Sequence, residues 1–266
     1  MKIPSKEEVI TFLKKCAKEK VIISKDAPIP IGKDLERHCI VVNPEMYYEV
    51  ILAFIRNGGD WRIFVESDVK HEEAHNLVEK YIKNVDWTKL MALSPIFRKN
   101  ISDIVEDYYI DNILLKDYFN KKYTAMQRML NEILDTAISS TKMWKKLGFV
   151  HQVHTDLMDL SLNIARGLID INRLDFPIEE MNFITRTVKA LKKIKRPEDM
   201  QRACEEIRDI TIDWLKKVGY IIEREHRFHT MSYRYITWRK IIFATCLGLS
   251  PVIPILIWLI LQRWSK

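Results

Sequence analysis

Residues 61–75 read W-R-I-F-V-E-S-D-V-K-H-E-E-A-H and mark a change from strand signals to helix signals along the chain. The aromatic and β-branched residues of 61–65 predict a short strand. Ser67 and Asp68 are residue types that often precede a helix, so a helix is predicted from about Val69 onward. Strand signals end here.

Strand and helix signals alternate before this stretch, and only helical signals follow it. Upstream, the predicted elements are a helix at 7–19, a strand at 21–23, a loop at 28–32, a strand at 38–42 and a helix at 45–56. Downstream, helical periodicity recurs in the segments 69–83, 99–119, 121–146, 148–171, 178–193, 197–217 and 219–236. This pattern predicts an α+β protein that is mostly α.

Three parts are expected along the chain. Residues 1–95 are predicted to form a small strand and helix unit, and residues 96–236 an all-helical body. Residues 241–261 are predicted to form a transmembrane helix. No repeat or low-complexity linker separates the first two parts, so they are compatible with one shared core.

The composition argues against several functional classes. The 266 residues include only 7 Gly, and neither G-x-G-x-x-G nor G-x-x-x-x-G-K occurs, so a dinucleotide fold or a P-loop NTPase is not expected. The four cysteines form no C-x-x-C pair, so neither a zinc ribbon nor a disulfide framework is indicated. The basic run at 192–196 lacks interleaved aromatic residues, so no nucleic-acid partner is expected.

The sequence His71-Glu72-Glu73-Ala74-His75 is an H-E-x-x-H motif on a predicted helix. Because residues i and i+4 share one helical face, both imidazoles can bind the same Zn²⁺, while Glu72 can polarise its water. The alternative is a solvated helix face, since further charged residues lie nearby in the sequence.

A catalytic zinc site also needs a third protein ligand and an open fourth position. Val78 and Tyr81 stand where the metzincin extension requires Gly and His, so that extension is absent. Residues 100–112, N-I-S-D-I-V-E-D-Y-Y-I-D-N, supply acidic candidates on a later helix, namely Asp103, Glu106 and Asp107. Acids on a buried face would be costly unless they paired with a cation or metal. The alternative is an amphipathic helix with its acids in water.

Over about residues 38–115, the order of predicted elements resembles the zincin metallopeptidases, specifically gluzincin-like peptidases in which an acidic ligand helix follows the H-E-x-x-H helix. Residues 61–65 stand in the place of the strand that lines the substrate groove. By position, the resemblance implies a Zn²⁺ cofactor with His71 and His75 as ligands, Glu72 as general base, and Asp107 or Glu106 as third ligand.

One departure from the family leaves the third ligand open. The gluzincin signature is E-x-x-x-D, whereas the matching spacing here is Asp103-x-x-x-Asp107. The oxyanion-stabilising residue has candidates only, which are Tyr108 and Tyr109 beside the acidic helix and His151 and His154 on a later one. The two histidines could equally form a second metal pair or lie on a helix surface.

Residues 241–261 contain no charged residue and are long enough to cross roughly 30 Å of hydrocarbon. Trp238-Arg239-Lys240 and Arg263-Trp264 flank them, as interfacial anchors flank membrane spans. Basic residues are more frequent upstream than downstream, so the positive-inside rule places the large N-terminal part in the cytoplasm. The sequence predicts a single-pass C-terminal anchor in a lipid bilayer, with burial in the protein core as the alternative.

Two functions follow from these features. The first is a membrane-tethered zinc metallopeptidase that hydrolyses a polypeptide substrate with a Zn-bound water and Glu72 as general base. The second is a non-catalytic, tail-anchored helical adaptor or scaffold with a vestigial or structural metal site. Motif and helical context favour the peptidase.

Removal of residues 237–266 is expected to release a folded, soluble protein that keeps its metal site, because the apolar run carries no metal ligand. Membrane fractionation and thermal melts of the full-length and truncated chains measure this. A full-length protein that is soluble without detergent, together with a truncated chain that fails to fold, would show that the run is a core helix.

Overall fold

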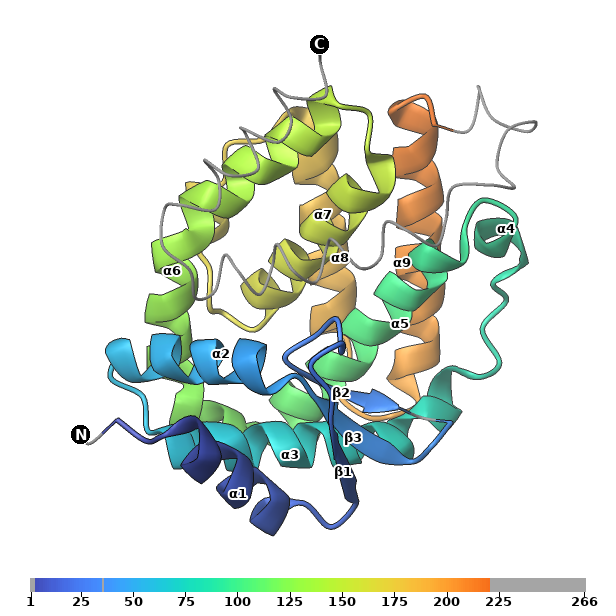
Figure 1. Ribbon diagram of the computed structural model, residues 1–266. Coiled ribbons are helices and arrows are strands. Elements are labelled where there is room, and N and C mark those ends of the chain that lie inside the picture. Colours follow the sequence, from blue (N-terminus) through green and yellow to red (C-terminus); the bar gives the residue numbers. More distant parts are fainter. Residues whose placement is uncertain (1–2, 35, 221–266) are drawn as a thin grey trace.

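The computed structural model describes residues 3–34 and 36–220 (Figure 1). Its first elements are α1 (Lys6–Cys16), β1 (Lys20–Ile23), β2 (Ile31–Asp34), β3 (Cys39–Val42), α2 (Pro44–Arg56) and α3 (Trp61–Val78). The elements that follow are η1 (Glu79–Ile82), α4 (Thr88–Met91), α5 (Pro95–Tyr109), η2 (Ile110–Leu114), α6 (Lys116–Lys146), α7 (Val150–Ala165), η3 (Ile171–Arg173), α8 (Ile178–Lys192) and α9 (Asp199–Lys217). η1 and η3 are 3₁₀-helices, and η2 is a π-helix. The prediction of an α+β, mostly α fold is confirmed for these residues.

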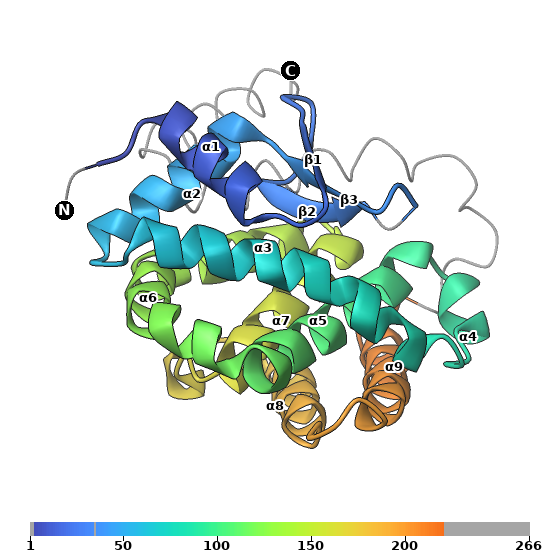
Figure 2. The ribbon, with the colours of Figure 1, turned by 90° about the horizontal axis from the view of Figure 1, so that it is seen from below.

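The sheet has the strand order β1-β3-β2, so β2 lies at one edge. β1 runs parallel to β3, with Lys20 opposite Cys39. β2 runs antiparallel to β3, with Ile31 opposite Val42. In Figure 2 the sheet, α1 and α2 lie on one side of α3, and the helices of the body lie on its other side. α3 therefore occupies the centre of the molecule.

The strands predicted at 21–23 and 38–42 are confirmed, but β2 falls where a loop was predicted. Gly32 had suggested a break in the chain. In the structure a Cβ at Gly32 would come within 2.1 Å of the Cδ1 atom of Ile29, so this glycine permits close packing inside a strand.

The prediction of a strand at residues 61–65 is wrong, because these residues form the first turns of α3. Asp60 caps the helix and accepts a hydrogen bond from the backbone N–H of Arg62. Ser67 and Asp68, which were predicted to precede the helix, lie within it. The apolar residues that suggested a strand recur at helical spacing on a buried face, which consists of Trp61, Phe64, Val65 and Val69. A five-residue apolar run is compatible with either a strand or a helix, and the packing of this face favours the helix.

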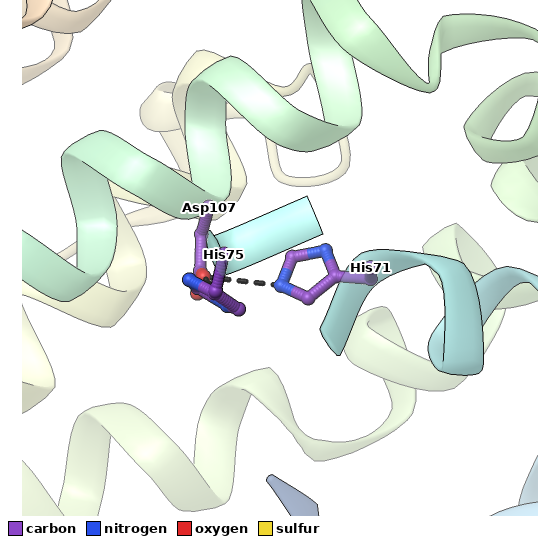
Figure 3. A group of neighbouring side chains, drawn as sticks. All are labelled: His71, His75 and Asp107. Atoms are coloured by element: carbon purple, nitrogen blue, oxygen red, sulfur yellow. Dashed lines mark hydrogen bonds and ion pairs between the residues drawn. The ribbon is translucent and has the colours of Figure 1, made fainter. Parts of the chain in front are cut away.

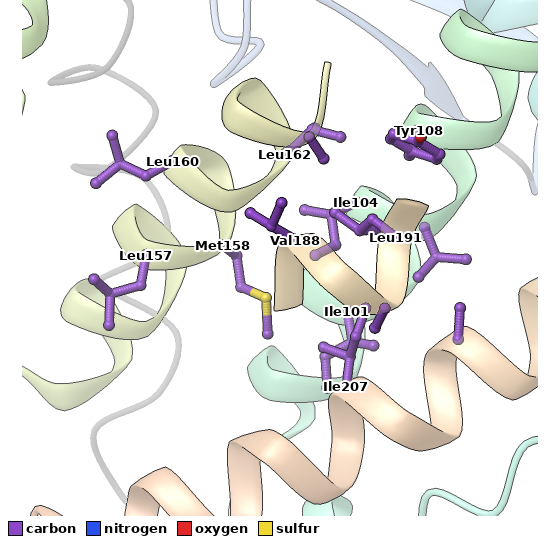
Figure 4. Packing of buried hydrophobic residues seen from close by; sticks show 14 of the residues in the cluster. Ile101, Ile104, Tyr108, Leu157, Met158, Leu160, Leu162, Val188, Leu191 and Ile207 are labelled. Carbon is purple, nitrogen blue, oxygen red and sulfur yellow. The ribbon is translucent and has the colours of Figure 1, made fainter. Parts of the chain in front are cut away.

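Buried side chains form two hydrophobic clusters, and α3 contributes to both. The first cluster joins α1, the sheet, α2 and the N-terminal half of α3, up to Val69. The second joins the C-terminal half of α3, from Ala74, to the helices of the body, part of whose packing is drawn in Figure 4. The change between clusters thus occurs inside α3, ahead of the boundary predicted near residue 95.

The helices predicted between residues 69 and 217 are confirmed, with shifted ends, and the helix predicted at 219–236 falls almost wholly outside the described residues. α5 begins at Pro95, because Ser94 caps it by accepting a hydrogen bond from the backbone N–H of Ile96. The continuous helix predicted at 99–119 is interrupted by the π-helical turn η2. None of the described helices has the length and apolar character needed to cross a bilayer. The predicted span at 241–261 lies outside the described residues.

Ile101→Ala is expected to lower the free energy of unfolding by about 2–5 kcal/mol, because deletion of a buried side chain leaves a cavity. Ile101 is fully buried in the second cluster. Ile178→Ala removes the same atoms from a side chain that is 66% exposed, so its effect should stay within about 0.5 kcal/mol. Urea unfolding of the full-length variants measures both effects. Similar losses at the two positions would contradict the assigned core.

Candidate metal centre

Two helices bring three potential metal ligands together. His71 and His75 lie four residues apart on α3, and Asp107 comes from α5 (Figure 3). One ligand atom from each side chain lies within 4.8 Å of the other two. Nε2 of His71 is 3.1 Å and Nε2 of His75 is 3.5 Å from Oδ1 of Asp107. The expected convergence of both imidazoles with a carboxylate is therefore found, and the carboxylate is Asp107.

The other ring nitrogen of each histidine contacts a buried carboxylate. Nδ1 of His71 is 2.8 Å from Oδ1 of Asp111, and Nδ1 of His75 is 2.8 Å from Oε2 of Glu106. A carboxylate at Nδ1 holds the proton there and leaves Nε2 as the ligand atom, which is the usual arrangement behind a metal-bound histidine. Glu106, predicted as a possible third ligand, is thus placed behind His75.

Asp111 is itself held by an arginine from the helical body. Its Oδ2 atom lies 2.6 Å from Nη2 of Arg166, and both side chains are almost fully buried. Burial alone would raise the pKa of Asp111, but the Arg166 guanidinium, together with His71 and Lys122, keeps it well below its ordinary value. Asp111 is therefore ionised and able to accept a hydrogen bond from His71.

The electrostatic field of the site favours positive charge at the histidines. Burial alone would lower the pKa of His71, but the nearby Asp111 and Asp107 carboxylates raise it well above the ordinary value. Burial likewise opposes a raised pKa at His75, and the hydrogen bond with Glu106 helps to overcome it. The same carboxylates that favour a proton on these rings would favour a divalent cation between them.

The charge balance around α3 also fits a bound cation. Carboxyl groups here come from Asp68, Glu72, Glu106, Asp107 and Asp111, whereas the cationic side chains in contact with them are Lys122 and Arg166. Burial raises the pKa of Asp68, Glu72 and Glu106, which shows that their negative charge is incompletely compensated. With neutral histidines, this set of groups carries excess negative charge that a divalent ion would reduce.

Glu72 belongs to the same site, but its side chain has fewer hydrogen-bond partners than those of the ligands. Among the described residues, no hydrogen-bond donor contacts its carboxylate. The nearby groups whose charges affect its pKa most strongly are His71, His75 and Asp107. Burial raises its pKa, and the two histidines offset only part of that effect. A carboxylate beside the ligands with a raised pKa has the properties of a general base.

The outer side of the motif attaches α3 to the N-terminal segment. Oε1 of Glu73 accepts a hydrogen bond of 2.6 Å from the backbone N–H of Lys18. Nδ2 of Asn76 donates one of 2.6 Å to Glu19. These residues thus hold the segment before β1 while the neighbouring histidines face α5, which replaces the solvated helix face considered as the alternative.

Other predicted candidates lie away from the ligands. Asp103 lies one turn before Asp107 on α5, but it is half exposed and pairs with Lys99 at 2.8 Å, and it is not one of the three converging ligands. Tyr108 and Tyr109, considered as oxyanion-stabilising residues, are buried in the second hydrophobic cluster.

His151 and His154 form neither of the two arrangements considered for them. His154 is fully buried, with Nδ1 3.1 Å from Nδ2 of Asn100 and Nε2 3.2 Å from Oγ1 of Thr211. Nε2 of His151 is 2.9 Å from the hydroxyl of Tyr220. The pair is therefore no exposed helix surface, and the metal-ligating group found in the described residues does not include it.

Asp111 and Arg166 were missed by the sequence analysis. A signal for Asp111 existed, because Asp107-x-x-x-Asp111 has the spacing that was matched to Asp103 and Asp107, one helical turn later. Arg166 lies 59 positions after Asp107, and nothing local to it in the sequence indicates a contact with that helix.

Comparisons of the chain with protein-family models, with curated proteins and with solved structures give no match.

His71→Ala and His75→Ala are each expected to reduce bound zinc from about one ion per chain to near none, because two remaining ligands hold zinc poorly. His38→Ala is the matched control, since His38 is exposed in the turn between β2 and β3. Metal analysis after equilibration with Zn²⁺ measures the content. Iron in place of zinc in the purified protein would contradict the zinc assignment, because two histidines and one carboxylate also suit Fe(II).

Proposed function

We propose that this protein is a zinc-dependent metallopeptidase of the zincin type. The observation that supports the proposal is the convergence of His71 Nε2, His75 Nε2 and Asp107 Oδ1, with Glu72 adjoining them on the same helix. Two imidazoles and one carboxylate leave a fourth zinc position open, as catalytic sites require. A structural zinc site would instead be closed by a fourth protein ligand.

The proposed reaction is hydrolysis of a peptide bond. When bound, zinc acts as a Lewis acid that acidifies water and polarises a carbonyl group. Glu72 accepts the proton of the attacking water and delivers it to the leaving amine. Asp111 and Glu106 keep both imidazoles oriented during this transfer, since each carboxylate holds the Nδ1 atom of one histidine.

The substrate is proposed to be an extended polypeptide that binds along β2. The resemblance assigned a groove-lining strand to residues 61–65, and those residues are helical. β2 is an edge strand that contacts α3, and the charge of Glu72 acts on Lys33 of this strand. An edge strand offers backbone N–H and C=O groups to which an extended peptide can add by strand pairing. We further propose that residues 241–261 tether the enzyme to a membrane from the cytoplasmic side, as their sequence predicts.

Glu72→Gln is expected to retain zinc and to lose hydrolysis by at least about 100-fold, because an amide cannot accept the proton of the attacking water. Glu73→Gln is the adjacent control, since its remaining carbonyl oxygen can still accept the hydrogen bond from Lys18. An unfolded polypeptide substrate is incubated with each zinc-loaded variant, and mass spectrometry of the products measures cleavage.

Three outcomes separate the possibilities in this experiment. Cleavage by wild type and Glu73→Gln but not by Glu72→Gln supports the mechanism. Equal cleavage by wild type and Glu72→Gln would show that another group is the base. Zinc binding without cleavage by any form would favour the non-catalytic adaptor with a structural metal site.

A further inference from the structure

The Asp111 carboxylate connects the metal ligands to the helical body. Its Oδ1 atom is 2.8 Å from Nδ1 of His71, and its Oδ2 atom is 2.6 Å from Nη2 of Arg166. Arg166 immediately follows α7, so this contact joins the end of α7 to the π-helical turn η2. One carboxylate thus joins the first histidine of the motif to a cation that never touches the ligand atoms.

Arg166 also contacts the backbone of the third ligand. Its Nη2 atom donates a 3.0 Å hydrogen bond to the carbonyl oxygen of Asp107. The guanidinium therefore holds two points at once, the side chain behind His71 and the main chain of Asp107. The first point supports the ring of His71, and the second belongs to the third proposed ligand.

The local backbone is unusual at this place. α5 ends at Tyr109 and continues as the π-helical turn η2, in which the N–H of Leu115 bonds to the carbonyl of Ile110 at 2.7 Å. Asp111 lies in this wider turn. π-Helical turns are rare and are concentrated at functional sites, because they alter the direction in which side chains leave a helix. Here the turn carries the residue that contacts both His71 and Arg166.

The surroundings of Arg166 indicate that this side chain is placed for the site. The side chain is 8% exposed, and its Nε atom is buried without a hydrogen-bond partner among the described residues. Buried N–H groups are seldom left unpaired. Nε is thus left without a hydrogen bond, while Nη2 contacts both Asp111 and the Asp107 carbonyl.

We propose that Arg166 is the positioning residue of the metal centre. Through Asp111 it fixes the ring of His71 with Nε2 toward the metal, and through the Asp107 carbonyl it fixes the turn of α5 that carries the third ligand. This inference rests on the proposed metal centre and adds to it a determinant outside the motif. Arg166 acts through other residues and touches neither metal nor substrate.

The test compares zinc affinity and cobalt spectra in full-length variants. Arg166→Met is expected to weaken zinc binding by about 10–100-fold, as loss of residues behind the ligands typically does. It should also change the visible spectrum of the Co²⁺-loaded protein, which reports ligand geometry. Arg166→Lys should restore part of the affinity, because lysine supplies the charge without the planar fork.

Lys145→Met is the control, since Lys145 is a cation of the helical body that pairs at 2.7 Å with the buried carboxylate of Glu180, away from the ligands. It should lower stability in urea while leaving zinc affinity and the cobalt spectrum close to wild type. Affinity is measured by competition with a chromophoric chelator. Arg166→Met that binds zinc as tightly as wild type, or Lys145→Met that weakens binding as much as Arg166→Met does, would overturn the positioning role.

The wild-type protein distinguishes an incorrect metal centre from an incorrect role for Arg166. If wild type binds neither Zn²⁺ nor Co²⁺, the proposed metal centre is wrong and Arg166 has nothing to position. If wild type binds and Arg166→Met does not differ, only the role of Arg166 is wrong. Should Arg166→Met not fold, Arg166→Lys and Asp111→Asn carry the test, with weaker zinc binding expected from both.

Discussion

The arrangement of α3 and α5 depends on how buried carboxylates between them are compensated. A buried acid is costly unless hydrogen bonds or an opposite charge stabilise it. Glu106 and Asp111 are both at least 94% buried, and each accepts from one histidine of the motif. Asp111 additionally requires Arg166. These contacts fix which faces of the two helices meet, because any rotation of α5 would separate its acids from their partners.

α3 meets three requirements with three of its sides. Its apolar side is divided between the two hydrophobic clusters, with Val69 in the first and Ala74 in the second. Its polar outer side holds the segment before β1 through Glu73. The remaining side presents the histidines to α5. Because several sides of α3 make contacts inside the protein, its sequence is only weakly amphipathic, which helps to explain why its N-terminal turns resembled a strand.

The sequence predicted those parts of the site that are set by local spacing. His71 and His75 share a face because any helix places i and i+4 together, and Asp107 was among the acids predicted to face them. Asp111 and Arg166 depend on contacts between helices far apart in sequence, 40 positions for Asp111 and His71. The π-helical turn that aims Asp111 has no signature in apolar periodicity. Most helices were predicted for the same local reason, whereas β2 and the start of α3 were decided by packing.

The position of the ligands within α3 connects the chemistry to the fold as a whole. His71 and His75 follow Val69, the last α3 residue of the first cluster, and flank Ala74, the first of the second. Both ligands therefore lie where the two packed clusters meet. A shift of one cluster against the other would bend α3 at this point and move the histidines relative to Asp107. Close packing on both sides resists such a shift, since interiors at crystal-like density deform little. The two clusters in this way supply rigidity to the proposed metal centre, and the polar contacts behind the histidines add their final orientation.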